Sequence, residues 1–82
     1  MASAQSLEIA RRAEEIYSQR LRADLEKTHW GFFVTIEPDT GDYYLGRRME
    51  EASAAARRAH PGKLTYTGRV GFPTAVEIGY CP

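Results

Sequence analysis

The sequence predicts a small α+β domain with the element order α-β-β-α-β-β and one four-stranded sheet, mixed or antiparallel. Three observations lead to this prediction. Residues 7–27 contain neither glycine nor proline and repeat apolar side chains at helical spacing. Residues 32–45 alternate apolar and polar side chains around the turn sequence Pro38–Gly41. An alanine-rich stretch at 47–60 then leads into a second alternating region at 63–80.

The composition predicts one domain, 1–82, with a frayed tail at 1–5, an N-terminal helix at 6–27 and a ββαββ core at 31–80. A chain of eighty-two residues buries only a small hydrophobic core. Its single cysteine cannot form an internal disulfide. We therefore expect a homo-oligomer, most simply a dimer, or a protein partner. The formal net charge of zero argues against nucleic acid and membrane surfaces as partners. We expect a cytoplasmic protein with no cofactor and no metal.

The N-terminal helix is predicted to be amphipathic. At about 100° per residue, one face carries Ile9, Ala13, Ile16, Tyr17 and Leu21, with Leu25 at its edge. Arg20 and Asp24 are the anomaly, because this i,i+4 pair projects on the apolar side. Two interpretations remain open: the pair lies at the rim of the core with its charges in water, or it forms an ion pair at a subunit interface.

The stretch 32–45 predicts a β-hairpin. Pro38 presets φ for a turn, and Gly41 supplies a positive φ. If residues 38–41 form the loop, Glu37 faces Asp42, Thr35 faces Tyr44 and Val34 faces Leu45. This register gathers the apolar side chains on one face, whereas a slip of one residue would mix the two faces.

The second helix, 47–60, is expected to lie on the apolar face of the sheet through a stripe of small side chains, namely Met49, Ala52, Ala55, Ala56 and Ala59. The other face would then be uncovered. By the predicted registers it carries Phe33, Tyr44, Arg69 and several threonines, and exposed aromatic patches mark partner sites. Phe33, Tyr44 and Arg69, together with Arg20 and Asp24, are therefore the candidate partner-interface residues.

The last region predicts a second hairpin. Leu64, Tyr66, Gly68 and Val70 would face inward, and Val70 would pair with Val76. Arg69 would then lie opposite Glu77 as a cross-strand charge pair. Trp30, in the break between the first helix and the first strand, is expected to cap one end of the core.

Asp39-Thr40-Gly41 matches the active-site tripeptide of aspartyl proteases, in which two aspartates share a proton. The context differs, since Pro38 precedes the aspartate and Asp42 follows the glycine. The same three residue types are also common in β-turns, and a turn is the interpretation that we favour.

No other motif points to catalysis. Gly68–Gly71 lacks the strand-to-helix context of a phosphate-binding loop. His29, His60 and Cys81 are far apart in sequence and fit no nucleophile-base signature. We therefore predict no catalytic residue.

A family resemblance covers about the last fifty residues. The chain resembles a group of short prokaryotic proteins of unknown function whose hairpin reads I-E-x-x-T-G-D-Y. The residues that carry this resemblance are Phe33–Glu37, Thr40–Tyr43, Glu51-Ala52, Ala56-Arg57 before Pro61, and Arg69–Gly71. Some of these proteins are encoded beside retropepsin-like protease or toxin–antitoxin-type genes. The chain is also similar, more weakly, to HicB-type antitoxins, whose hairpin precedes a helix that begins with an acidic-alanine pair. Neither resemblance implies catalytic residues.

The preferred hypothesis is a non-enzymatic protein-interaction module, antitoxin-like by resemblance. One alternative is a nucleic-acid-binding regulator that uses Arg47, Arg48, Arg57 and Arg58, although Glu50 and Glu51 beside them argue against it. The other alternative is a small hydrolase or protease subunit that uses Asp39.

Overall fold

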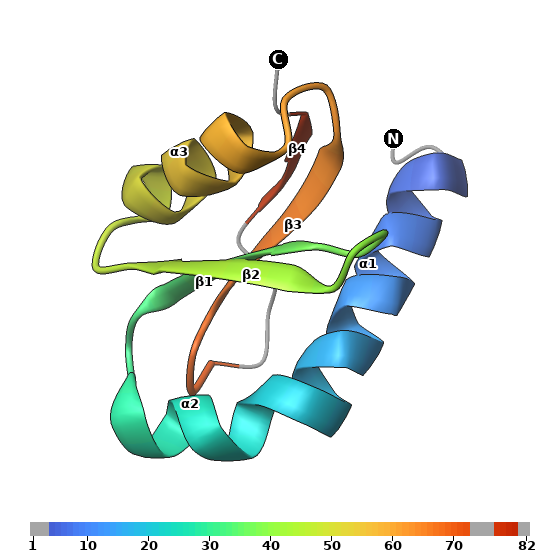
Figure 1. Cartoon of the computed structure of the whole chain (residues 1–82). Coiled ribbons are helices and arrows are strands. Elements are labelled where there is room, and N and C mark those ends of the chain that lie inside the picture. Colours follow the sequence, from blue (N-terminus) through green and yellow to red (C-terminus); the bar gives the residue numbers. More distant parts are fainter. Residues whose placement is uncertain (1–3, 73–76, 81–82) are drawn as a thin grey trace.

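Helices cover both faces of an antiparallel sheet in the computed structural model, which describes residues 4–72 and 77–80 (Figure 1). The predicted α+β class is confirmed. The elements are α1 (Ala4–Ile16), the π-helical turn η1 (Tyr17–Leu21), α2 (Arg22–Thr28), β1 (Phe33–Glu37), β2 (Asp42–Gly46), α3 (Met49–Ala59), β3 (Leu64–Arg69) and β4 (Glu77–Tyr80). The strands lie in the order β2-β1-β3-β4, and each neighbouring pair is antiparallel.

The N-terminal helix is interrupted by η1, and the spacing of its apolar residues explains why. Ile9, Ala13, Tyr17, Leu21 and Leu25 recur every four residues, whereas an α-helix has about 3.6 residues per turn. Each step of four therefore rotates the side chain about 40° too far. A π turn holds more residues and removes part of that rotation. As a result Leu25, which the α-helical pattern places at the edge of the face, is buried together with Leu21.

The first hairpin has the predicted register. Thr35 pairs with Tyr44, Ile36 with Tyr43 and Glu37 with Asp42. Gly41 has a φ of 81° and donates its amide to the carbonyl of Glu37 at 2.9 Å. The side chain of Glu37 is buried and accepts hydrogen bonds from the amide and the hydroxyl of Thr40, at 2.7 and 2.9 Å. The turn is therefore held by its own side chains.

The predicted place of the second helix is wrong. The apolar face of the sheet, with Val34, Ile36 and Tyr66, packs against Ile9, Ala13, Leu21 and Leu25 of the N-terminal helices. α3 lies on the opposite side of the sheet (Figure 1). The physical reason is size: the N-terminal helices carry large aliphatic side chains that fill the space over valine and isoleucine. The alanines of α3 suit a face of short side chains.

The predicted uncovered face is therefore covered. Thr35, Thr65 and Thr67 are buried beneath α3, whose Ala52 and Ala56 have no exposed surface. The hydroxyls of Thr35 and Thr67 form a hydrogen bond at 2.9 Å across β1 and β3, so burial leaves neither without a partner. Gly46 allows the closest approach, because a Cβ there would lie 2.7 Å from Cβ of Glu51.

The predicted pairing of Arg69 with Glu77 is also wrong. Glu77 lies opposite Thr67, so the register of β3 and β4 is shifted by two residues. A shift of two residues keeps each side chain on its face, which is why the apolar pattern did not reveal it. The predicted partner of Val70, Val76, lies outside the described residues, as do the first three residues of the predicted frayed tail.

Candidate functional site

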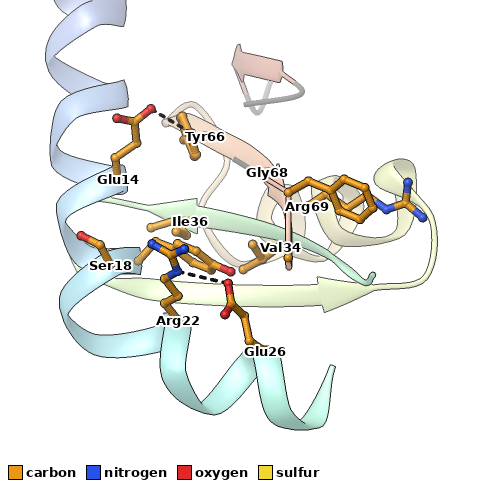
Figure 2. A pocket seen from close by; sticks show the side chains of 12 residues that line it. Glu14, Ser18, Arg22, Glu26, Val34, Ile36, Tyr66, Gly68 and Arg69 are labelled. Carbon is orange, nitrogen blue, oxygen red and sulfur yellow. Dashed lines mark hydrogen bonds and ion pairs between the residues drawn. The ribbon is translucent and has the colours of Figure 1, made fainter. Parts of the chain in front are cut away.

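A pocket of about 410 Å³ lies between the N-terminal helices and the sheet (Figure 2). Its floor is apolar and comes from β1 and β3, with Val34, Ile36 and Gly68. Polar side chains of the helices stand around it. The remaining lining residues are Glu14, Tyr17, Ser18, Arg22, Glu26, Tyr66, Arg69, Gly71 and Phe72.

Gly68 leaves the pocket open. It lies opposite Val34 in the register, on the apolar face, where its neighbours along β3 carry buried side chains. A Cβ at this position would meet only Cε1 of Tyr66, at the ordinary contact distance of 3.5 Å. The strand therefore has room for a side chain at residue 68, and the glycine supplies empty volume.

The hydroxyl of Tyr17 is buried, and the backbone of Gly71 lies beside it. Burial raises the pKa of this phenol, and the negative charge of Glu26 raises it further. The backbone of Gly71 and the charge of Arg22 oppose this shift. Tyr17 is thus a protonated donor at neutral pH, and it belongs to the π turn, a feature that is frequent at functional sites.

Tyr66 is the second phenol of the pocket, and its hydroxyl donates to Oε1 of Glu14 at 3.1 Å (Figure 2). Burial is the main cause that raises its pKa to about 12, and the carboxylate of Glu14 adds to the shift. On the other side of the pocket, Nε of Arg22 donates to Glu26 at 3.1 Å. The charges at the rim therefore occur in both signs and are largely engaged with one another.

A group of aromatic side chains adjoins the pocket, and we call Trp30, Phe33, Arg69 and Phe72 the aromatic patch. The Arg69 guanidinium lies 4.5 Å from the centre of the Phe72 ring and 5.3 Å from that of Phe33. Trp30 and Phe72 contact each other with ring centres 6.5 Å apart. Trp30 is 62% exposed and Phe72 48%, so the prediction that Trp30 caps the core is wrong.

The backbone holds the aromatic patch in place. Gly71 has a φ of 90°, and a Cβ there would lie 2.7 Å from the Trp30 indole. Nε of Arg69 donates to the carbonyl of Gly31 at 3.0 Å. Two residues of the patch, Arg69 and Phe72, also line the pocket, so the two features form one continuous surface.

The structure separates the five predicted interface residues. Phe33 and Arg69 meet in the aromatic patch, while Tyr44 lies beneath the end of α3 with its ring 6.1 Å from that of His60. Arg20 and Asp24 are both exposed, and within the described part of the chain they form no ion pair. Arg20 instead extends to the hairpin turn, beside Gly41.

Asp39 and Arg48, which the hydrolase and nucleic-acid alternatives would use, form ion pairs with other side chains of the chain. Asp39 accepts from Lys63 at 3.3 Å and from Arg12 at 3.1 Å, and these two cations lower the pKa of its carboxyl. Such a carboxylate ties α1 and the start of β3 to the hairpin turn. On α3, Nε of Arg48 lies 3.4 Å from Glu50, which reduces the positive charge that nucleic acid would meet.

The histidines do not assemble a catalytic group. Nε2 of His60 lies 3.0 Å from a carboxylate oxygen of Asp42, whereas Nδ1 of His29 contacts the hydroxyl of Thr28. Cys81 lies outside the described residues. Within the described ranges no cluster of three or more histidine, cysteine, aspartate or glutamate side chains could hold a metal ion.

Neither the pocket nor the aromatic patch was predicted from the sequence as such. A signal for the patch was present, since Trp30-Gly31 precedes β1 and Gly71-Phe72 follows β3. In an antiparallel pair these two flanks must meet at the same end of the sheet. For Tyr17 no comparable signal exists, because a tyrosine on the apolar face of a helix reads as an ordinary core residue.

A scan against protein-family models finds no match, and searches of curated proteins and of solved structures find none either. In the described part of the chain, no helix combines the length and the apolar character needed to cross a membrane. A functional proposal for this chain therefore depends on the surface described above.

Proposed function

We propose that the chain is a non-enzymatic protein-interaction module that binds its partner through the aromatic patch. The observation that carries this proposal is the contact between Trp30 and Phe72, two large aromatic side chains about half exposed or more, with Arg69 stacked on the Phe72 ring. Tryptophan and arginine are enriched among the residues that dominate binding energy at protein interfaces. The partner we expect first is a second copy of the chain.

Rigidity supports this assignment. Arg69 stacks between Phe33 and Phe72 and is also held by the Gly31 carbonyl, so its side chain is already ordered. A preformed patch loses less conformational entropy when a partner binds than a set of free side chains would. Its position also fits, because the patch lies where β1 begins and β3 ends, beyond the core that the N-terminal helices cover. A role like that of an antitoxin, which covers a protein partner, is one form of this function.

The test is sedimentation velocity over a concentration series, comparing the wild type with Trp30→Ala and Phe72→Ala. We expect each substitution to raise the concentration at which half of the protein is dimeric by at least about tenfold, as for an interface hot spot. Leu7→Ala is the matched control, since Leu7 is also 62% exposed. It lies on α1, which begins at the other end of the molecule from the turn between α2 and β1 (Figure 1).

A photo-crosslinking amino acid at position 72 extends the test to other partners. If the chain is monomeric at every concentration, the proposal requires a crosslink at position 72 to one recurring protein in cells of the source organism. It also requires that Trp30→Ala abolish that crosslink. A strict monomer that forms no such crosslink would contradict the proposed function.

A further inference from the structure

β2 is an edge strand, so only one side of its backbone is paired within the sheet. Its neighbour is β1, and among the described residues no strand lies on its other side (Figure 1). Proteins commonly protect such edges with lysine, proline, a bulge or a covering segment. β2 contains neither lysine nor proline, and its pairing with β1 runs from one end to the other without a bulge. An open hollow beside the start of this strand is lined by Arg20, Gly41, Asp42, Tyr43 and Tyr44.

The two faces of β2 limit how a second copy of the strand can pair with it. Tyr43 and Leu45 lie opposite Ile36 and Val34, so the odd-numbered residues belong to the face that the N-terminal helices cover. The even-numbered residues belong to the face of α3. In an antiparallel pair, side chains that lie directly opposite each other point to the same face. The two-fold axis of such a pair therefore passes through a residue of β2 and never between two residues.

Charge selects one of the allowed registers, the register centred on Leu45. It places Leu45 opposite its own copy, Tyr43 opposite Arg47, and Asp42 opposite Arg48. The last pair joins opposite charges, and the arginine of the second pair can stack on the tyrosine ring. Symmetry repeats both contacts. A register centred on either of the two preceding residues would instead place Asp42 opposite an uncharged residue.

The side chains that this register uses are accessible. Tyr43 is 42% exposed. Arg47 is exposed, and within the described ranges it forms no ion pair. Asp42 and Arg48 are also exposed, and their printed contacts engage one carboxylate oxygen of the first and only Nε of the second. The backbone of Arg48 is extended, with a φ of −122° and a ψ of 151°, which suits the continuation of a strand.

We infer that β2 pairs antiparallel with β2 of a second copy of the chain, about a two-fold axis at Leu45, so that the two sheets become continuous. This inference goes beyond the proposed function, since the aromatic patch contains no residue of β2. The two contacts can therefore form at the same time. A chain with two self-complementary surfaces forms dimers through one of them, and these dimers associate through the other.

Single cysteine variants in a Cys81→Ser background test the register. Cβ atoms of directly opposite residues are about 4.5 to 5.5 Å apart, which is close enough for a disulfide to form on oxidation. A mixture of Tyr43→Cys and Arg47→Cys should crosslink fastest. Leu7→Cys, at a position that is 62% exposed on α1, is the control and should not crosslink with Arg47→Cys. Faster crosslinking of Tyr43→Cys with itself or with Leu45→Cys, or no crosslink in any mixture, would overturn the inference.

Charge exchange tests the contact between Asp42 and Arg48. Asp42→Arg and Arg48→Asp each place two like-charge pairs across the axis and should raise the concentration of half-association about tenfold or more. An equimolar mixture of the two variants should restore wild-type association, because each heterodimer regains two pairs of opposite charge. Circular dichroism checks that each variant is folded. A mixture of folded variants that associates no better than either variant alone would refute the contact.

The two proposals are measured in separate backgrounds. Crosslinking in Trp30→Ala reports on β2 alone, and sedimentation in Asp42→Arg reports on the aromatic patch alone. If the expected crosslink forms but Trp30→Ala leaves association in the Asp42→Arg background unchanged, self-association through the patch is wrong and the pairing of β2 stands. If Trp30→Ala disrupts association but no cysteine mixture crosslinks, the pairing of β2 is wrong and the proposed function stands.

Discussion

Replacing Ile36 by alanine is expected to lower the free energy of unfolding by about 3 to 5 kcal/mol. Ile36 has no exposed surface and lies in the core between β1 and the N-terminal helices. The substitution removes apolar contacts and leaves a cavity that rigid strand neighbours cannot close. A domain of this size has a total stability of roughly 4 to 12 kcal/mol, so the variant should be close to unfolding. Urea titration followed by circular dichroism measures the change.

Ile36→Val and Leu7→Ala complete this experiment. Valine keeps most of the volume and should cost about 0.5 to 1.5 kcal/mol. Leu7 is largely exposed, so its truncation should change the free energy of unfolding by less than about 0.5 kcal/mol. A loss below about 1 kcal/mol in Ile36→Ala would mean that this side chain is not in the core.

Gly46→Ala is expected to lower the free energy of unfolding by about 2 to 3 kcal/mol. The added Cβ would lie 2.7 Å from Cβ of Glu51 and 2.8 Å from the backbone nitrogen of Ala52. Backbone atoms of α3 cannot move aside without shifting the helix off the sheet. The expected loss therefore reports directly on the packing of α3 against β2, and thermal or urea unfolding measures it.

Gly68→Ala is the matched control for this substitution. It adds the same methyl group to β3 of the same sheet, where the nearest side-chain atom is 3.5 Å away. Its free energy of unfolding should lie within about 1 kcal/mol of the wild type. If the two alanine variants were equally stable, α3 would not lie against Gly46.

The sequence was sufficient for the first hairpin because two independent signals agree there. One register gathers Val34, Ile36 and Leu45 on one face, and Pro38 and Gly41 fix a loop that gives the same register. The second hairpin lacked such a check. A shift of two residues preserves the alternation, and the loop length alone then decides whether Glu77 faces Arg69 or Thr67.

The sequence did not show which face of the sheet α3 covers, because a threonine side chain carries both a polar hydroxyl and an apolar methyl group. Thr35 and Thr67 read as solvent-facing positions in an alternating strand, yet their hydroxyls bond to each other and their methyl groups can be buried. The face therefore accepts a helix of alanines. The π turn was not predicted either. A projection with strictly α-helical spacing places Leu25 at the edge of the apolar face, whereas the wider turn brings Leu25 into the core.

The candidate site depends on these same features. η1 contributes Tyr17 to the lining of the pocket, and Trp30 and Phe72 are exposed where β1 begins and β3 ends. Of the predicted interface residues, Phe33 and Arg69 belong to this place. Their assignment to an interface stays a prediction, and its basis has changed from an open sheet face to a patch at the sheet's end.

The arrangement of one helical layer on each face of the sheet is the claim on which the rest depends, and methyl-to-methyl nuclear Overhauser effects test it most directly. We expect the methyl groups of Ala52 and Ala56 to show contacts with those of Thr35 and Thr67. Val34 and Ile36 should instead show contacts with Leu21 and Leu25. Contacts from Ala52 and Ala56 to Val34 and Ile36 would place α3 on the apolar face and contradict the account.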